Sequence, residues 1–115
     1  MREKLKDKER LNHILEAIEN ILEFTLEVDF NSFSKNRILQ FAIIKNLEII
    51  GEAANFLTIE LKDQAVDIKW RDIIGLRHVL VHGYYQISNE IIWKTIENDL
   101  LPLKNKVLAI LDEFE

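Results

Sequence analysis

The sequence predicts an all-α fold, an antiparallel bundle of four to five helices, from three observations. One proline and three glycines in 115 residues are too few turn-forming residues for a chain of many short β-strands. Apolar residues recur at spacings of three and four, the pattern of helices that bury one face. Neither a linker nor an internal repeat is visible, so residues 1–115 are expected to form a single domain.

A first helix is expected from near Asp7 up to the segment DFNSFS, in which Ser34 is a candidate N-cap for a second helix from Lys35. The residues of the first helix that recur at helical spacing share one face: Leu11, Ile14, Leu15, Ile18, Leu22, Thr25 and Leu26. Its other face forms an acidic stripe that is expected to be solvated, made by Glu16, Glu19, Glu23 and Glu27.

The second helix is apolar nearly all round: Ile38, Leu39, Phe41, Ala42, Ile43, Ile44, Leu47, Ile49, Ile50, Ala53, Ala54, Phe56 and Leu57. A helix without a polar face is usually covered on more than one side. Because a chain of this length has few other helices to cover it, a second copy is the natural cover. The sequence therefore predicts a homodimer.

The segment TIELKDQAVDIKW is expected to be a connection that Ile68 and Trp70 anchor in the core. A third helix should follow from about Trp70 to Val81, with Gly83 where a C-terminal glycine cap belongs.

Ser88 is the expected N-cap of a fourth helix over residues 89–113, which Pro102 should kink or split. Gly51 and Gly75 lie inside expected helices, where a missing side chain permits close helix approach.

Composition excludes several classes of protein. Cysteine is absent, so neither a disulfide framework nor a thiolate metal site is expected. The net charge of −5 argues against a general nucleic-acid binder, and any contact with a polyanion should be local. The first ten residues, MREKLKDKER, lack the apolar core of a signal peptide, and no apolar run has the length of a membrane span. We expect a cytoplasmic protein without membrane contact.

The strip GLRHVLVHGYY, residues 75–85, carries the residues most suited to chemistry. On an ideal helix a narrow polar stripe is formed by Arg71, Gly75, His78 and His82. Arg77 falls inside the apolar arc instead. An isolated buried charge is very costly, so this guanidinium must be paired, reach a cleft or face another chain.

Three interpretations of the strip are open from spacing alone. His78 and His82 stand four residues apart, as zinc ligands on a helix do, but a third ligand is hard to name because His13 is remote in sequence. In the second interpretation, the two histidines form a solvated polar face. Thirdly, His82 could act as general acid or base and Arg77 as the cation in phosphodiester cleavage without metal. Arg77 and His82 lie about 140° apart on an ideal helix. To act on one phosphate they therefore need a distorted turn, the reach of the long arginine side chain or a second chain.

The segment RHVLVHGY, Arg77 to Tyr84, resembles the R-x4-H-x-Y motif of HepT toxins in the HEPN superfamily. The resemblance covers most of the chain, because IIKNLEIIGEAANFL (43–57), IKWRDIIGLRHVLVHGYY (68–85) and IIWKTIENDLLPL (91–103) follow the order and register of that family.

This resemblance implies an α-helical homodimer with the motif in a cleft at the interface. It implies the toxin of a type VII HEPN/MNT toxin–antitoxin system, a metal-independent ribonuclease that needs no cofactor. An MNT-type nucleotidyltransferase antitoxin would neutralise it by attaching AMP to the motif tyrosine. The alternative is a catalytically silent HEPN subunit that binds the nucleotidyltransferase without cleaving RNA.

Carried over residue by residue, the resemblance implies that Arg77 is the transition-state cation and His82 the general acid or base. Tyr84 would be the AMP acceptor, with Tyr85 as a neighbouring hydroxyl. The position after the motif arginine is commonly Asn or Asp in the family, whereas here it is His78. Two polar residues of the second helix, Asn46 and Glu52, match polar positions of the family pattern and are candidate supports of the cleft.

Overall fold

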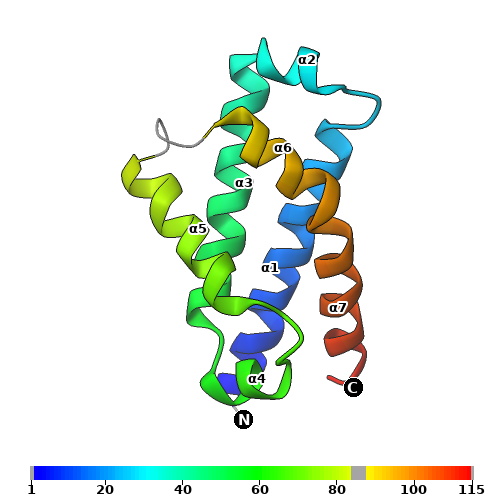
Figure 1. Cartoon of the computed structure of the whole chain (residues 1–115). Helices are drawn as coiled ribbons and strands as arrows, with labels where there is room; N and C mark the ends of the chain where they lie inside the picture. Colours follow the sequence, from blue (N-terminus) through cyan, green and yellow to red (C-terminus); the bar gives the residue numbers. More distant parts are fainter. Residues whose placement is uncertain (1, 84–87, 115) are drawn as a thin grey trace.

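The computed structural model describes residues 2–83 and 88–114, and all regular structure in those ranges is α-helical. The predicted all-α class is therefore confirmed. The helices are α1 (Arg2–Phe24), α2 (Phe30–Ser34), α3 (Arg37–Phe56), α4 (Ile59–Gln64), α5 (Trp70–Gly83), α6 (Asn89–Asn98) and α7 (Leu100–Asp112). The long helices run up and down in turn, so that α1 begins and α7 ends at the same end of the bundle (Figure 1).

Side-chain caps define where most of the helices begin. Asp29 caps α2 by accepting from the Ser32 amide at 2.8 Å, and Thr58 caps α4. Ser88 caps α6 as predicted, because its hydroxyl accepts from the Ile91 amide at 3.2 Å. The second long helix is capped by Asn36 rather than by Ser34, since the Asn36 side chain accepts from the Leu39 amide at 3.0 Å. Asparagine and serine cap about equally well, so propensity alone does not separate the two positions.

Several predicted boundaries differ from the structure. The first helix already includes Arg2, and the segments expected to be a break and a connection contain the short helices α2 and α4. Gly83 is buried as the last residue of α5, and no described glycine has a positive φ, so the expected left-handed cap is wrong. The predicted fourth helix is divided at Asp99 into α6 and α7, with Pro102 in the first turn of α7, where a missing amide is tolerated.

The core lies mainly between α1 and α3, the innermost pair in Figure 1. Fully buried side chains from five helices meet there: Leu11, Ile14, Ile18, Ile21, Phe33, Ile43, Leu80 and Val107. Trp70 and Ile68 are buried as predicted, and the Trp70 indole donates to the Ala65 carbonyl at 3.2 Å, which fixes the start of α5. At the opposite end of the bundle, Trp93 of α6 packs on Phe33 of α2 with ring centroids 5.1 Å apart.

The described chain leaves part of α3 uncovered. Ile38 is 84% exposed and Phe56 54% exposed, although both belong to the helix that the sequence indicated to be apolar nearly all round. The residues of the predicted acidic stripe are exposed, although Glu27 lies beyond the end of α1 at Phe24. Of the helices in residues 2–83 and 88–114, none combines the length and the apolar character that crossing a membrane requires.

Candidate functional site

The position of Arg77 depends on a close crossing of α3 and α5. Gly51 of α3 is buried at this crossing, and a Cβ atom placed on it would overlap Arg77 Cβ. The same atom would lie 2.8 Å from Arg77 Cγ and 3.1 Å from the Ile73 carbonyl oxygen. Gly51 therefore provides the space that the stem of Arg77 occupies. Gly75 differs, because a Cβ placed there would meet no described atom within 4 Å apart from its chain neighbours and the adjacent backbone of α5, so its expected role in close approach is wrong.

The next residue of α3 engages the charged end of the same arginine. The Arg77 guanidinium lies 2.5 Å from a carboxylate oxygen of Glu52, with side-chain exposures of 31% and 47%. This answers the question that the sequence raised about a cation in an apolar arc. Arg77 is paired, and its head remains accessible to solvent.

Arg77 and Glu52 line a groove of about 610 Å³ between α1, α3 and α5. Three basic side chains, those of Arg10, Lys45 and Arg77, face it together with three carboxylates, those of Glu9, Glu48 and Glu52. Arg10 also lies 5.4 Å from the centroid of the Phe56 ring and donates to the Phe56 carbonyl at 2.9 Å. The groove is thus close to electrically balanced in a chain with a net charge of −5.

His13 of α1 lines this groove as well, and sequence reasoning had set it aside as remote. It shares a face of α1 with Glu9 and Arg10, at spacings of four and three, which by itself indicates only a solvated surface. The packing of α1 on α3, which local spacing does not reveal, brings this imidazole into the groove of Arg77.

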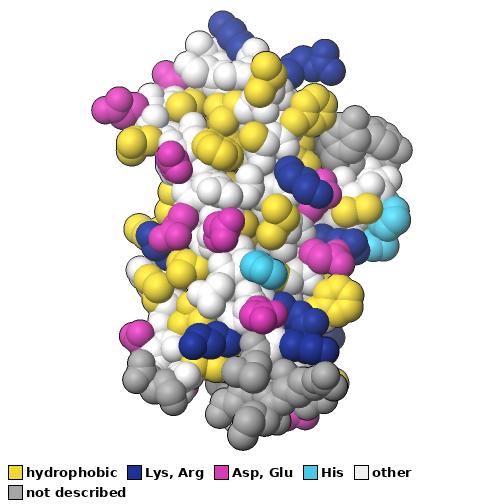
Figure 2. Space-filling model, turned by 180° about the vertical axis from the view of Figure 1, so that it is seen from behind, with side chains coloured by type: hydrophobic (Ala, Val, Ile, Leu, Met, Phe, Trp, Pro, Cys, Tyr) yellow, Lys and Arg dark blue, Asp and Glu magenta, His cyan; other side chains and the backbone are white. Residues whose placement is uncertain are grey.

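His78 and His82 lie on the exposed side of α5, and their ring centroids are 4.7 Å apart. The whole predicted polar stripe of α5, which includes Arg71 and Gly75, is exposed. In Figure 2 two histidines lie together at one edge of the face and a third lies apart near its middle. His82 is not among the described residues that line the groove of Arg77. Within one chain, the two motif residues therefore face different surroundings.

The other expected site residues lie in different settings. Asn46 is only 7% exposed, accepts from the Asn20 amide group at 3.1 Å and donates to the Ala42 carbonyl at 2.8 Å. It joins α1 to α3 beneath the surface. Tyr84, the expected AMP acceptor, and Tyr85 lie outside the described residues. Across the described ranges, no group of three or more His, Cys, Asp or Glu side chains is arranged to hold a metal ion.

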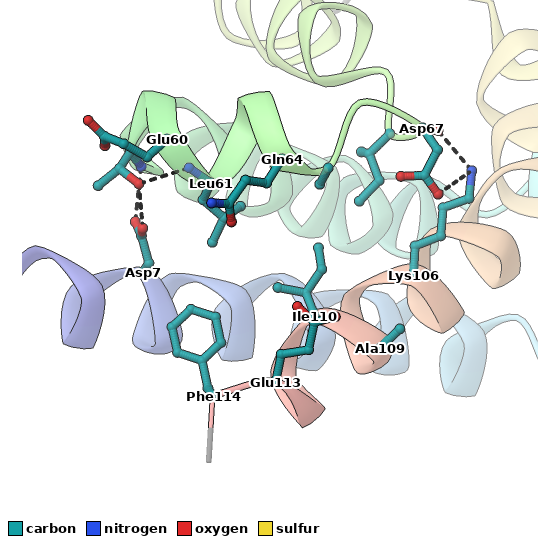
Figure 3. A pocket seen from close by; sticks show the side chains of 13 residues that line it. Asp7, Glu60, Leu61, Gln64, Asp67, Lys106, Ala109, Ile110, Glu113 and Phe114 are labelled. Carbon is teal, nitrogen blue, oxygen red and sulfur yellow. Dashed lines mark hydrogen bonds and ion pairs between the residues drawn. The ribbon is translucent and has the colours of Figure 1, made fainter.

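A second cavity, of about 580 Å³, lies between the start of α1, α4 and the C-terminal segment (Figure 3). Asp7, which is 3% exposed, points from α1 toward α4 and accepts from the Thr58 hydroxyl at 2.6 Å and the Thr58 amide at 3.0 Å. The other charged residues that line this second cavity are Glu60, Asp67, Lys106 and Glu113. This acidic excess disfavours a nucleic-acid backbone there.

Comparison with known proteins gives consistent matches. A family model described as Ribonuclease HepT-like matches residues 14–110. A Thermococcus cleftensis protein named "Probable ribonuclease HepT" is 40% identical over 103 residues, which cover 90% of this chain and 94% of that protein. Two proteins with provisional RNase names, from Methanocaldococcus jannaschii and Caldanaerobacter subterraneus, are 34% and 35% identical, over 84% and 90% of this chain and 89% and 92% of their own lengths. No solved structure gives a significant match.

Proposed function

Because the chain belongs to the HepT-like ribonuclease family, we propose that it is the toxin of a HEPN/MNT toxin–antitoxin pair and cleaves RNA without a metal ion. Arg77 and His82 are the catalytic residues of this proposal. The observation that carries it is the setting of Arg77, whose guanidinium is held by Glu52 at the wall of a solvent-accessible groove. A guanidinium in that position can donate two parallel hydrogen bonds to phosphate oxygens and so stabilise the negative charge that develops during cleavage.

The proposed mechanism divides the work between a cation and imidazoles. Arg77 stabilises the negative charge of the transition state, and His82 accepts the proton of the attacking 2′-hydroxyl or donates one to the leaving oxygen. Two imidazoles are needed if acid and base are separate groups. A pair of chains supplies two copies of His82, and His78 stands beside each.

We propose that the active unit is a homodimer, because Arg77 and His82 of one chain face different surroundings. Three apolar side chains of α3 are exposed, those of Ile38, Phe41 and Phe56, and Phe56 also lines the groove. Val79 and Val81 of α5 are exposed as well. A second copy that covers this face would bring its own His82 toward Arg77.

Cleavage of RNA in EDTA tests the mechanism. The wild type should cleave, whereas Arg77→Ala and His82→Ala should each lose about 10²–10⁴-fold in rate. Equal activity of all three proteins would overturn the assignment. Circular dichroism of each variant checks that the bundle is still folded.

A mixed dimer tests whether one site uses both chains. Neither Arg77→Ala nor His82→Ala should be active alone, but a dimer of one chain of each retains one complete pair across the interface. We expect it to recover up to about half of the wild-type rate, since one of two sites is restored. No recovery in a purified mixed dimer would contradict a site that needs only one Arg77 and one His82 from opposite chains.

We further propose that an MNT-type nucleotidyltransferase neutralises the toxin by transferring AMP from ATP to the Tyr84 hydroxyl, with pyrophosphate as the leaving group. Intact mass after incubation with the partner and ATP should rise by whole AMP units, and peptide mapping should place them. Tyr84→Phe should abolish the first addition and Tyr85→Phe should leave it intact. A mass that never changes in the presence of active partner would contradict this step.

The alternative function is that of a silent subunit that binds the nucleotidyltransferase. The Glu52 carboxylate favours it, because a phosphate must compete with that carboxylate for Arg77. Expression of the chain alone separates the two proposals. Growth arrest with RNA cleavage supports the toxin, whereas normal growth with abundant folded protein and intact RNA supports the silent subunit.

A further inference from the structure

The outer face of α5 carries two imidazoles side by side. His78 and His82 are both exposed, their ring centroids are 4.7 Å apart and their planes are inclined by 54°. They belong to one continuous helix, Trp70–Gly83, so the backbone fixes their spacing.

This separation suits a shared metal ion. Two imidazoles bound to one ion through nitrogen–metal bonds of about 2.0–2.1 Å, at an angle between 90° and tetrahedral, place their ring centroids about 4.5–5.2 Å apart. The observed 4.7 Å lies within that interval. The spacing of the two rings along the helix therefore already suits one shared ion.

We propose that His78 and His82 form a two-point binding site for a divalent transition metal ion, and that occupation of this site inhibits the ribonuclease. Imidazole nitrogen is a ligand for Zn²⁺, Cu²⁺ and Ni²⁺, whereas Mg²⁺ and Ca²⁺ prefer oxygen ligands. Since no described cluster offers a third side chain, water completes the coordination. Binding is reversible and weaker than at a closed four-ligand site.

Inhibition follows from the role assigned to His82, and this part of the inference rests on the proposed function. A metal ion held by His82 occupies the nitrogen lone pair that a general base uses, and it removes the proton that a general acid donates. Added zinc should therefore lower the rate of a nuclease that needs no metal. The binding site itself depends only on the geometry of α5.

Isothermal titration of the full chain with ZnCl₂, NiCl₂ and MgCl₂ tests the binding. We expect about one zinc or nickel ion per chain and no heat from magnesium. His78→Gln and His82→Gln should each weaken zinc binding by about tenfold or more, and His13→Gln, the matched control on α1, should not. Unchanged zinc affinity in a folded His78→Gln, His82→Gln double variant would overturn the site.

RNA cleavage at increasing zinc concentration tests the consequence. The rate should fall with a midpoint near the calorimetric dissociation constant, recover on addition of EDTA, and be indifferent to magnesium. Zinc that binds with the expected stoichiometry but leaves the rate unchanged would refute inhibition. Failure of the metal-free protein to cleave any RNA would refute the proposed function instead, and the calorimetric result would stand independently.

Discussion

Replacing Gly51 with alanine tests the packing that positions Arg77. The new methyl group would overlap Arg77 Cβ and approach Arg77 Cγ to 2.8 Å and the Ile73 carbonyl oxygen to 3.1 Å. The first and last of these atoms are fixed by the backbone of α5. A change of side-chain rotamer therefore cannot relieve the overlap, and the two helices must separate or shift.

Two effects of opposite sign set the magnitude. Alanine is favoured over glycine inside a helix by about 1 kcal/mol. Overpacking of a close contact costs about 1–3 kcal/mol, and the overlap at Gly51 belongs at the upper end of that range. We expect Gly51→Ala to lower the free energy of unfolding by about 2 kcal/mol, the difference of about 3 and about 1 kcal/mol.

Urea unfolding followed by circular dichroism measures this effect, at one fixed protein concentration because the proposed dimer would gain stability with concentration. Gly75→Ala is the matched control, since it lies in a helix and its new methyl group would meet no described neighbouring element within 4 Å. It should raise the stability by up to about 1 kcal/mol. If Gly51→Ala were stabilised as much as Gly75→Ala, the close crossing would be refuted.

The same substitution should impair the proposed cleavage, because movement of α5 separates the Arg77 guanidinium from Glu52 and from the groove. We expect a loss of about 100-fold in rate for a misplacement of this kind. A folded Gly51→Ala protein with the wild-type rate would show that the position of Arg77 is not decisive.

Three further predictions address other contacts. Glu27 has φ of 61°, where an L-residue is strained by about 1–2 kcal/mol, so Glu27→Gly should raise the urea midpoint; a lower midpoint would contradict the strain. Hydrogen bonds from Ser32 hold the pKa of Asp29 below its usual value. The contribution of this carboxylate to stability is therefore present at neutral pH and is lost as the pH falls through the lowered pKa. Asp29→Asn should make the melting temperature less dependent on pH in the acid range, and an unchanged dependence would refute the role of Asp29. Glu52→Gln should change the free energy of unfolding by less than about 1 kcal/mol, because the Arg77–Glu52 ion pair is partly exposed. The kcat for RNA cleavage should fall about tenfold because Arg77 loses its orientation, and KM should not rise. Steady-state kinetics that show only a higher KM would contradict the positioning role of Glu52.

The features that depend on local patterns were predictable from the sequence. Helical periodicity predicted the class, the exposed acidic stripe of α1 and the exposed polar face of α5. Ser88 was recognised as a cap because serine precedes a clear amphipathic segment. The short helices α2 and α4 were not predicted, because five or six residues are too few to display a 3.6-residue period.

The features that depend on tertiary packing were not predictable. Gly51 and Gly75 look alike in sequence, but Gly51 meets a neighbouring helix and Gly75 faces open space. His13 joins the groove of Arg77 only through the packing of α1 on α3. Helix α3 carries apolar residues over most of its circumference, so its sequence does not indicate which apolar side receives α5.

Gly51 and Glu52 are neighbours in the chain, and both serve a single arginine from another helix, one by its missing side chain and one by its charge. The substitutions that these positions tolerate should therefore be linked during evolution. A relative without the arginine is released from the need for glycine at position 51, whereas one that retains the arginine but has a bulkier residue there must reposition α5. In distant relatives, this turn of α3 should distinguish chains that hold the arginine in place from chains that merely contain it.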